Sequence, residues 1–303
     1  MISIAVIAAY KNTFQKTKEE MNMNYNLTEH EMKAVRQIEG FRQWLEEHIR
    51  AENTVLAYTS AVRQFFSMYE QPDSDTLQLY KCFLLENYKP QTVNQRIRAL
   101  NCYMEYQNLS VPPIAMLRMQ QKTYVENVVS QADYEYLKRC LVRDGNHLYY
   151  FLIRFMAATG VRVSELVQIR TENVEAGWLN LYSKGNKSRR VYIPKSLQND
   201  TLGWIAREEH PPGLLFLNRF GDPVTPAAIR GQLRKFSFLY GLNPAVLHPH
   251  SFRHRFAKNF IEACGDISFL SDLLGHQSIE TTRIYLHRSR AEQQIIVNQV
   301  VNW

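Results

Sequence analysis

Cysteine is scarce in this chain of 303 residues. The four cysteines, Cys82, Cys102, Cys140 and Cys264, lie far apart and form no Cys-x-x-Cys pair. A zinc ribbon needs ligands paired at short spacing, and a disulfide framework is typical of small secreted chains. Neither is indicated here, and a reducing cytoplasm is the simplest compartment to expect.

Long apolar runs and low-complexity tracts are also missing. The stretch Met1 to Tyr10 is apolar for only about ten residues and has no basic segment before it, which is too short and wrongly flanked for a signal peptide or a membrane span. No other segment approaches the length needed to cross a bilayer, so no membrane partner is expected. With 45% hydrophobic residues and this length, the chain is expected to fold nearly throughout, as two domains.

Charge is unevenly placed. Residues 1 to 125 carry 14 Lys and Arg against 13 Asp and Glu, whereas residues 126 to 303 carry 22 against 16. The C-terminal part therefore holds +6 of the formal net charge of +7. Such an excess is expected of a domain that binds phosphate groups.

The first part of the chain has the pattern of a helical unit. Apolar residues recur at three- to four-residue spacing from about Lys33 to Asn108, which predicts four helices. They are expected within Lys33 to Ile49, Thr54 to Tyr69, Leu77 to Tyr88 and Thr92 to Tyr106. Asn53 and Gln91-Thr92 stand where helix caps belong, and Val111-Pro112-Pro113 ends the last helix.

The second part mixes helices with one hairpin. Ser130 is a good N-cap for a helix past Leu141, Gly160 stops the apolar helix from Leu148 to Ala158, and Ser164 is expected to cap Glu165 to Arg170. The period then changes to two, and Trp178 to Ser183 and Arg189 to Ile193 flank the turn 184 to 187. Three more helices are expected: one with Phe252, Phe256 and Phe260 on its buried face, ending at Gly265; Ile267 to Leu274, ending at Gly275; and one from Ser278 that carries Tyr285.

Five short segments of this second part supply an unusual set of basic and aromatic side chains. They read Ala158-Thr159-Gly160-Val161-Arg162-Val163-Ser164-Glu165-Leu166, Ser183-Lys184-Gly185-Asn186-Lys187, His250-Ser251-Phe252-Arg253-His254, Leu274-Gly275-His276-Gln277 and Thr281-Thr282-Arg283-Ile284-Tyr285. Two guanidiniums, an ammonium and two imidazoles can hold one phosphodiester, and a tyrosine phenol can attack it. The set predicts an enzyme that breaks DNA strands through a covalent phosphotyrosine.

Tyr285 is the predicted nucleophile. Its phenol is mostly protonated at neutral pH, so it needs a base or a cationic field, and His250 is the predicted base. Arg162 and Arg253 are predicted to hold the non-bridging oxygens, and His276 to donate a hydrogen bond to the same phosphate. Taken singly, the cations could be surface charges, the histidines core residues and the tyrosine an ordinary helix aromatic.

Glu165, three residues after Arg162, has two open interpretations. It could orient a catalytic side chain, or it could be a first-turn carboxylate favoured by the helix dipole.

In order and local sequence, these segments resemble the tyrosine recombinase family, of the phage-integrase and Xer-like type, over roughly residues 36 to 295. The resemblance implies a mainly α fold with a small β-sheet in two domains. Residues 1–32 would be an N-terminal extension, 33–110 a helical, SAM-like core-binding domain, 111–129 a linker, and 130–303 an α+β catalytic domain with a C-terminal exchange tail.

The resemblance also implies the reaction: site-specific exchange between short DNA sites, for integration, excision, inversion or resolution. A 3′ phosphotyrosine and a free 5′ hydroxyl would be the intermediates, and Lys184 the general acid for the 5′ oxygen, with Lys187 as its rival. Bond energy is kept in the phosphotyrosine, so no ATP or other cofactor is expected. A type IB topoisomerase would share this chemistry, whereas a catalytically silent DNA-binding protein would lack a catalytic position, and all are present.

A metal site is the alternative use of the histidines. His248, His250, His254 and His276 lie in this region, and His250 and His254 have helical i, i+4 spacing. No acidic residue interrupts them as in His-Glu-x-x-His, and no Cys or Asp cluster joins them. Catalysis without a metal is therefore expected.

Double-stranded DNA and copies of the chain itself are the expected partners. The family's core-binding domain lays two helices across DNA, which suggests contacts from polar residues near two helix starts: Asn53, Thr54, Tyr58, Thr92, Asn94, Gln95, Arg96 and Arg98. A solvated helix face is the alternative. The resemblance implies a homotetramer assembled on two DNA sites. It also implies a bacterial, cytoplasmic protein that is associated with the nucleoid when bound to DNA. The apolar tail is expected to dock into a neighbouring protomer or to pack against its own protomer, through Ile295, Ile296, Val297, Val300, Val301 and Trp303.

Overall fold

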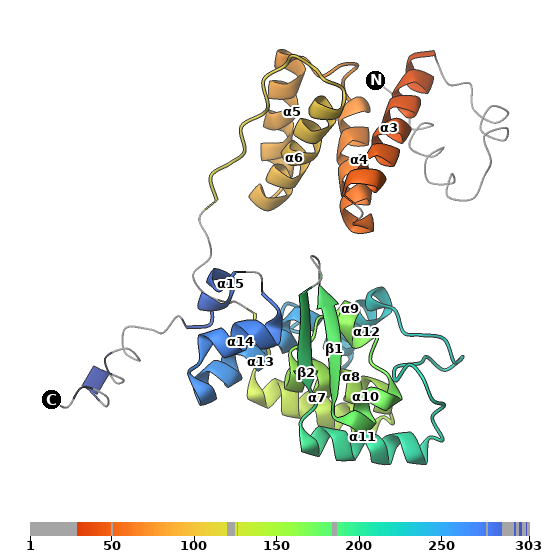
Figure 1. Cartoon of the computed structure of the whole chain (residues 1–303), viewed down its shortest axis with the longest axis vertical. Helices are drawn as coiled ribbons and strands as arrows, with labels where there is room; N and C mark the ends of the chain where they lie inside the picture. The colour runs from red at the N-terminus through yellow and green to blue at the C-terminus, as the bar shows by residue number, and fades with distance from the viewer. Residues whose placement is uncertain are drawn as a thin grey trace. The chain divides into compact units, whose positions relative to one another are not determined.

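The computed structural model describes residues 29–49, 51–119, 125, 127–183, 187–276, 278–286, 294, 297–298 and 301. The chain divides into two compact units, Met1–Gln121 and Lys122–Trp303, and the division falls within the segment 111–129 that the sequence suggests as a linker. The described elements are mostly helices with one two-stranded sheet, so the predicted fold class is confirmed (Figure 1). None of the described helices is long and apolar enough to span a bilayer.

The first unit contains four described helices around one core. They are α3 (Glu29–His48), α4 (Glu52–Phe66), α5 (Ser74–Asn87) and α6 (Pro90–Tyr106). Phe41, Phe65, Tyr80 and Tyr103 are almost fully buried, and their rings meet mostly edge to face. Helix α3 begins at Glu29, inside the segment predicted to be an extension.

Two helix starts in this unit differ from the prediction. Helix α4 has Ala51 as its N-cap and α6 has Lys89, so Asn53 and Gln91-Thr92 lie inside the first turns. Neither cap residue makes a side-chain hydrogen bond. In α6 the cause is Pro90 at the first helical position, whose fixed φ is preset for a helix and whose missing N–H would have no partner there.

The first residues of the predicted linker belong to the first unit. The side-chain amide of Asn101 both donates to and accepts from the backbone of Ile114, at 3.0 and 2.9 Å. Asn94 pairs in the same way with the backbone of Leu117, at 2.9 and 2.7 Å. Ile114 is buried in the core of this unit, so the segment that follows α6 packs back along α6 and is held there by these hydrogen bonds.

The second unit is built around two packed helices, α8 (His147–Thr159) and α13 (Pro249–Cys264), with α7 (Gln131–Arg143) beside α8. Around them lie α9 (Val163–Leu166), α10 (Thr171–Ala176), α11 (Lys195–Arg207), α12 (Pro226–Leu239), α14 (Ile267–Leu274) and α15 (Glu280–Arg283). Helices α10, α11 and α12 have no counterpart in the sequence prediction.

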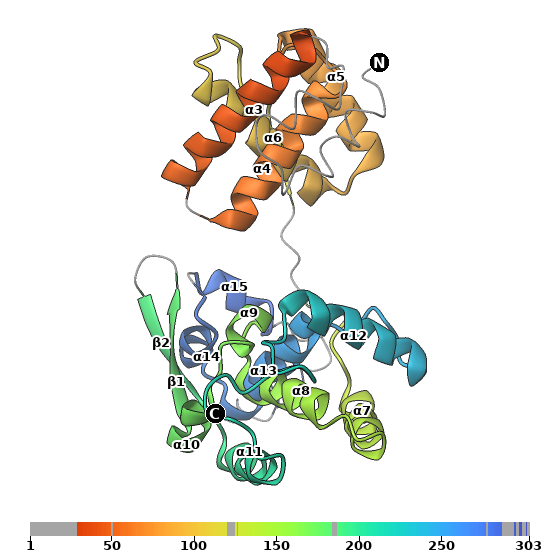
Figure 2. The same ribbon diagram turned by 90° about the vertical axis from the view of Figure 1, so that its right-hand side faces the viewer.

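The hairpin lies at one edge of this unit, beside α14 (Figure 2). Strand β1 (Trp178–Ser183) has the predicted bounds, and β2 (Lys187–Tyr192) begins two residues before the predicted Arg189. The strands pair antiparallel, with Trp178 opposite Tyr192 and Leu181 opposite Arg189. Their inner residues Leu179, Leu181 and Val191 are buried in the main core.

Local stop signals are largely correct in the second unit. The Ser130 hydroxyl accepts a hydrogen bond from the Asp133 N–H at 3.0 Å and caps α7 as predicted. Gly160, Gly265 and Gly275 end α8, α13 and α14 in the left-handed conformation, which a residue with a Cβ adopts only with strain.

Two predicted helices near the catalytic motifs are wrong. Arg162, not Ser164, is the N-cap of the short helix α9, which ends at Leu166. The helix expected to carry Tyr285 is only α15, which begins after Ile279 and ends at Arg283. Tyr285 lies in the turn that follows, where its N–H binds Thr282 O at 3.1 Å.

Candidate active site

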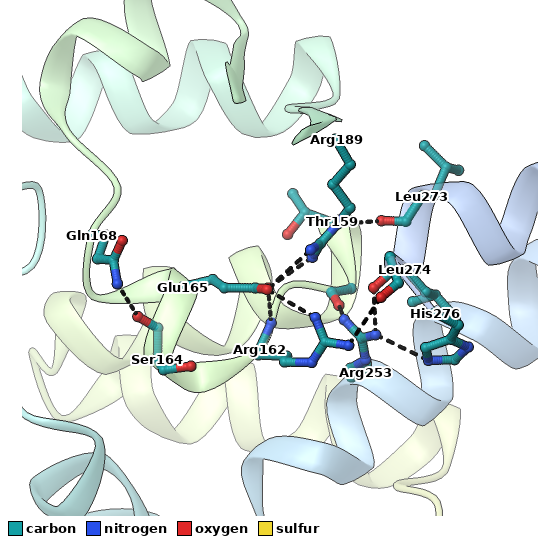
Figure 3. A network of polar contacts seen from close by, with 12 residues as sticks. Thr159, Arg162, Ser164, Glu165, Gln168, Arg189, Arg253, Leu273, Leu274 and His276 are labelled. Atoms are coloured by element: carbon teal, nitrogen blue, oxygen red, sulfur yellow. Dashed lines mark hydrogen bonds and ion pairs between the residues drawn. The ribbon is translucent and has the colours of Figure 1, made fainter. Parts of the chain in front are cut away.

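The C-terminal end of α14 gathers three arginines. Arg189 Nε donates to Leu273 O at 3.0 Å, Arg253 Nη2 to Leu274 O at 2.7 Å, and Arg162 Nη2 to Gly275 O at 3.3 Å (Figure 3). The last carbonyls of a helix lack partners within it and carry partial negative charge, so cations are favoured there. One helix end therefore positions three guanidiniums that come from distant parts of the chain.

Glu165 joins two of these arginines. Its carboxylate accepts from Arg189 at 3.0 and 2.7 Å, from Arg162 Nη1 at 2.9 Å and from the Arg162 N–H at 2.7 Å. Burial would raise the pKa of Glu165, but the hydrogen bonds from Arg189 and Arg162 outweigh it and lower the pKa. The carboxylate is therefore charged at neutral pH and holds Arg162 in place, while it also satisfies the backbone N–H of Arg162, the N-cap residue of α9.

Arg253 is the most deeply placed cation of the site. It is 4% exposed, and its guanidinium also donates to Gly160 O and contacts His276 Nε2 at 3.1 Å. Burial, followed by the charge of Arg162, lowers the pKa of Arg253 to about 10. It remains a cation at neutral pH, and its fork is fixed by two backbone carbonyls.

Gly160, whose carbonyl accepts from Arg253, lies at a close approach of α8 to α13. It has φ +65°, and a Cβ at this position would collide with the ring of Phe256 on α13. We expect Gly160→Ala to destabilise the protein by about 2–4 kcal/mol, because backbone strain and the clash add. Gly265→Ala is the matched control: φ is +73° but the space is open, so about 1 kcal/mol of strain is expected. Urea unfolding of both variants measures the difference, and equal losses would show that the Phe256 contact is unimportant.

His276 connects Arg253 with the segment that leads to Tyr285. Its Nδ1 lies 2.8 Å from Thr282 Oγ1. A guanidinium only donates, so Nε2 accepts from Arg253 and Nδ1 carries the hydrogen. Burial, then the charges of Arg253, Arg162 and Arg189, lowers the pKa of His276 to about 4, which leaves it neutral. The predicted donation to phosphate requires a proton on Nε2, which a bound anion would favour.

Tyr285 has its phenol beside a histidine that the sequence does not single out for it. The Tyr285 hydroxyl lies 2.6 Å from His254 Nδ1, and the ring centroids are 5.7 Å apart. Burial raises the pKa of Tyr285 to about 12, against the lowering effect of the Arg253 charge. The phenol is therefore protonated in the free protein, and it lies within the electrostatic reach of Arg253.

Of the other predicted site residues, the structure describes the side chain of His250 but not those of Lys184 and Lys187. His250 lies one turn before His254 on α13, and its pKa is lowered by burial first and then by Arg253, His248, Arg162 and Arg230. The proposed acid, Lys184, lies outside the described residues, and of its rival Lys187 only the backbone in β2 is described. Their roles stay predictions.

Two further partners escape sequence reasoning. Arg189 is in the predicted hairpin, but nothing local indicates that it reaches Glu165 and Leu273. Thr282 is fully buried and binds His276, although its sequence context is that of an ordinary helix residue. For Arg189 the sequence offers one indication of a role in the site, namely its position two residues after Lys187. For Thr282 it offers none.

The candidate DNA-contacting residues of the first unit differ in what they already bind. Asn94 has its amide fastened to Leu117, and Arg96 donates to Gln64 Oε1 at 2.6 Å and lies 4.5 Å from the centroid of the Tyr88 ring. These two side chains are half-buried and stabilise the unit itself. Their contact with DNA stays a prediction that the geometry does not favour.

The remaining candidates are better placed. Asn53, Gln95 and Arg98 are exposed, and Thr54, Tyr58 and Thr92 are half-buried. Arg98 hydrogen-bonds Tyr58, whose pKa is raised, by burial first, against the effect of Arg98.

Within the described part of the chain, no group of three or more His, Cys, Asp or Glu side chains is arranged to hold a metal ion. His250 and His254, the pair with ligand-like spacing, have ring centroids 6.4 Å apart. His254 instead binds the Tyr285 hydroxyl.

Comparisons with known proteins agree with this geometry. The phage integrase family matches residues 134–292. A tyrosine recombinase of Agathobacter rectalis is 27% identical over 286 residues, covering 82% of this chain and 90% of that protein. Tyrosine recombinase XerA of Pyrococcus furiosus is 26% identical over 260 residues, covering 82% and 88%.

Solved structures share the fold. The Tn1549 transposon integrase in complex with transposon right end DNA has a TM-score of 0.69 at 16% identity, over 87% of this chain and 99% of that one. The XerH site-specific recombinase bound to palindromic difH substrate has a TM-score of 0.68 at 17% identity, over 96% and 92%. The family match extends over more than half of the chain and includes Arg162, Arg253, His276 and Tyr285. The chain belongs to the phage integrase family, as a tyrosine-type site-specific recombinase.

Proposed function

We propose that this recombinase acts on double-stranded DNA through Tyr285, which attacks the scissile phosphate to give a 3′ phosphotyrosine and a free 5′ hydroxyl. The observation that carries the proposal is the convergence of Arg162 and Arg253 on the end of α14, with Tyr285 within electrostatic reach of Arg253. The DNA-bound integrase and XerH, which share the fold, support DNA as the substrate.

The two arginines bind the phosphate. Arg162 has a side chain 36% exposed and donates to only two acceptors within the described residues, so other N–H groups of its fork are left for a non-bridging oxygen. Arg253 is held by carbonyls and needs no reorganisation when charge develops on the phosphorane. Glu165, itself held by Arg189, fixes the orientation of the Arg162 guanidinium, and His276 supplies the third contact with the phosphate.

The direct test uses duplexes selected from a random pool for binding to the full chain, then nicked near the cleavage point so that the cut product diffuses away. We expect a covalent adduct with its phosphate on Tyr285, located by peptide mapping, and recombination between two intact sites. Relaxation of supercoils without two-site recombination would instead indicate a topoisomerase-like enzyme.

Lys184 is proposed to protonate the leaving 5′ oxygen. We expect Lys184→Ala to lose cleavage of ordinary DNA by about 100-fold or more and to recover it on a 5′-bridging phosphorothiolate, because sulfur leaves without a proton. Lys187→Ala is the matched control from the same hairpin. Rescue of Lys187→Ala in place of Lys184→Ala would assign the role to Lys187.

Recombination of two sites is proposed to need four protomers, joined by the C-terminal tail. Val297 and Val301 are 51% and 46% exposed, which leaves apolar surface for a neighbouring protomer. Ile295, Ile296, Val300 and Trp303 lie outside the described residues.

A further inference from the structure

The Tyr285 hydroxyl lies 2.6 Å from His254 Nδ1, within hydrogen-bond distance. His254 follows Arg253 directly on α13, so the same helix turn carries a cation of the proposed phosphate site and a partner of the nucleophile. The His254 ring is half-buried, and Tyr285 packs against the apolar cluster of Ala257, Ile261, Leu270 and Leu274. The packing of Tyr285 on α13 and α14 holds its hydroxyl within hydrogen-bond distance of His254.

The protonation states suit a proton transfer from the phenol to the imidazole. Burial, then the charges of His250, His248 and Arg253, lowers the pKa of His254 to about 4, so its ring is neutral at pH 7. The Tyr285 phenol is protonated under the same conditions. A neutral imidazole with its hydrogen on Nε2 presents a lone pair on Nδ1, which is the atom that faces the phenol.

We propose, on the basis of the function proposed above, that His254 accepts the Tyr285 proton during DNA cleavage. As the Tyr285 oxygen forms its bond to phosphorus, its O–H bond breaks and the proton moves to His254 Nδ1. The bond from phosphorus to the 5′ oxygen breaks, and that oxygen takes a different proton from the general acid. In rejoining, the His254 imidazolium returns its proton to the departing tyrosine oxygen.

In the free protein the pKa of Tyr285 is about 12 and that of His254 about 4, but this difference does not prevent the transfer. Phenol acidity rises steeply as the oxygen bonds to phosphorus, and the incoming phosphate, an anion, favours the imidazolium. His250, the base predicted from sequence, interacts with Arg162 and Arg253, and its ring lies 6.4 Å from that of His254. His250 is therefore placed toward the arginine pair, and His254 toward the nucleophile.

The test compares His254→Asn with His250→Asn in the full chain. An asparagine keeps a hydrogen-bonding atom near the place of Nδ1 but cannot take a proton. We expect His254→Asn to form adduct on the nicked duplex about 100-fold more slowly at pH 7, with unchanged DNA affinity and thermal stability. The rate should rise about tenfold per pH unit from pH 7 to pH 9, where Arg253 is still a cation, because the phenolate fraction then replaces the missing base. His250→Asn should lose a constant factor at every pH.

The pH slope separates proton transfer from positioning. The charges of His250, His248 and Arg253, on α13 or at its N-cap, lower the pKa of His254, and the Tyr285 hydroxyl from the segment after α15 lies within hydrogen-bond distance of it. A rate of His254→Asn within about threefold of the parent at pH 7, or a deficit that stays constant from pH 7 to pH 9, would overturn the proposal. So would the slope if it appeared in His250→Asn alone. Failure of the proposed function is a separate result, since it appears as an adduct of the parent protein on a residue other than Tyr285.

Discussion

Tyr285→Phe is expected to abolish covalent attachment to DNA while DNA affinity stays within about twofold, because phosphate contacts dominate affinity. The change removes one oxygen, and that oxygen is the proposed nucleophile. The phenol contributes to packing chiefly through its ring, which Phe retains among the apolar residues of α13 and α14. Adduct formation on a nicked duplex, followed by denaturing electrophoresis, measures the loss.

Tyr240→Phe is the matched control. Tyr240 binds Asp144 Oδ2 at 2.9 Å through a hydroxyl that takes no part in the arginine network. We expect a stability loss of about 1 kcal/mol and an unchanged cleavage rate. If the Tyr285→Phe protein still forms an adduct, another residue is the nucleophile and the proposed chemistry is wrong.

Local features of the fold are predictable because neighbouring residues decide them. The stops at Gly160, Gly265 and Gly275 and the cap at Ser130 follow from backbone freedom and from a hydroxyl that reaches an N–H three residues on. The hairpin follows from its period of two and its short turn.

Features set by tertiary contacts are not predictable in this way. Ser164 has the right chemistry for a cap, but the carboxylate of Glu165 already satisfies the Arg162 N–H, so the helix begins earlier. The helix expected at Tyr285 ends at Arg283, and within that short helix the Thr282 hydroxyl is engaged by His276. At the start of α9 a specific side-chain partner sets the boundary, which local propensity alone does not give.

The site shows the same division. Residue types and order predict which groups bind the phosphate and which attacks it, and the predicted residues Arg162, Arg253, His276 and Tyr285 lie in one region of the structure. Their partners cannot be predicted in this way, because Arg162 meets Gly275 across 113 residues and Tyr285 meets His254 across 31. The histidine beside the nucleophile is the clearest example, since the sequence points to His250 as the base and the structure places His254 against the Tyr285 hydroxyl.

Arg253→Lys is expected to abolish most activity and to destabilise the protein as well. A lysine keeps the charge, but its single ammonium cannot serve Gly160 O, Leu274 O and His276 at once. At 4% exposure, an unsatisfied carbonyl has no water to replace the lost donor. We expect a cost on the order of 2–4 kcal/mol, seen as a melting temperature lower by about 5–10 °C, together with a loss of cleavage of at least about 100-fold.

Arg162→Lys separates the two effects. Its side chain is 36% exposed, and Glu165 keeps its bidentate contact with Arg189 when Arg162 is changed. The stability loss should therefore stay below about 1 kcal/mol, while cleavage falls by about 100-fold or more because the fork for the non-bridging oxygen is gone. Melting curves and adduct formation, measured on both variants, give the comparison. Equal destabilisation by the two substitutions would show that Arg253 is not the structural member of the pair, and full cleavage by Arg162→Lys would remove that residue from phosphate binding.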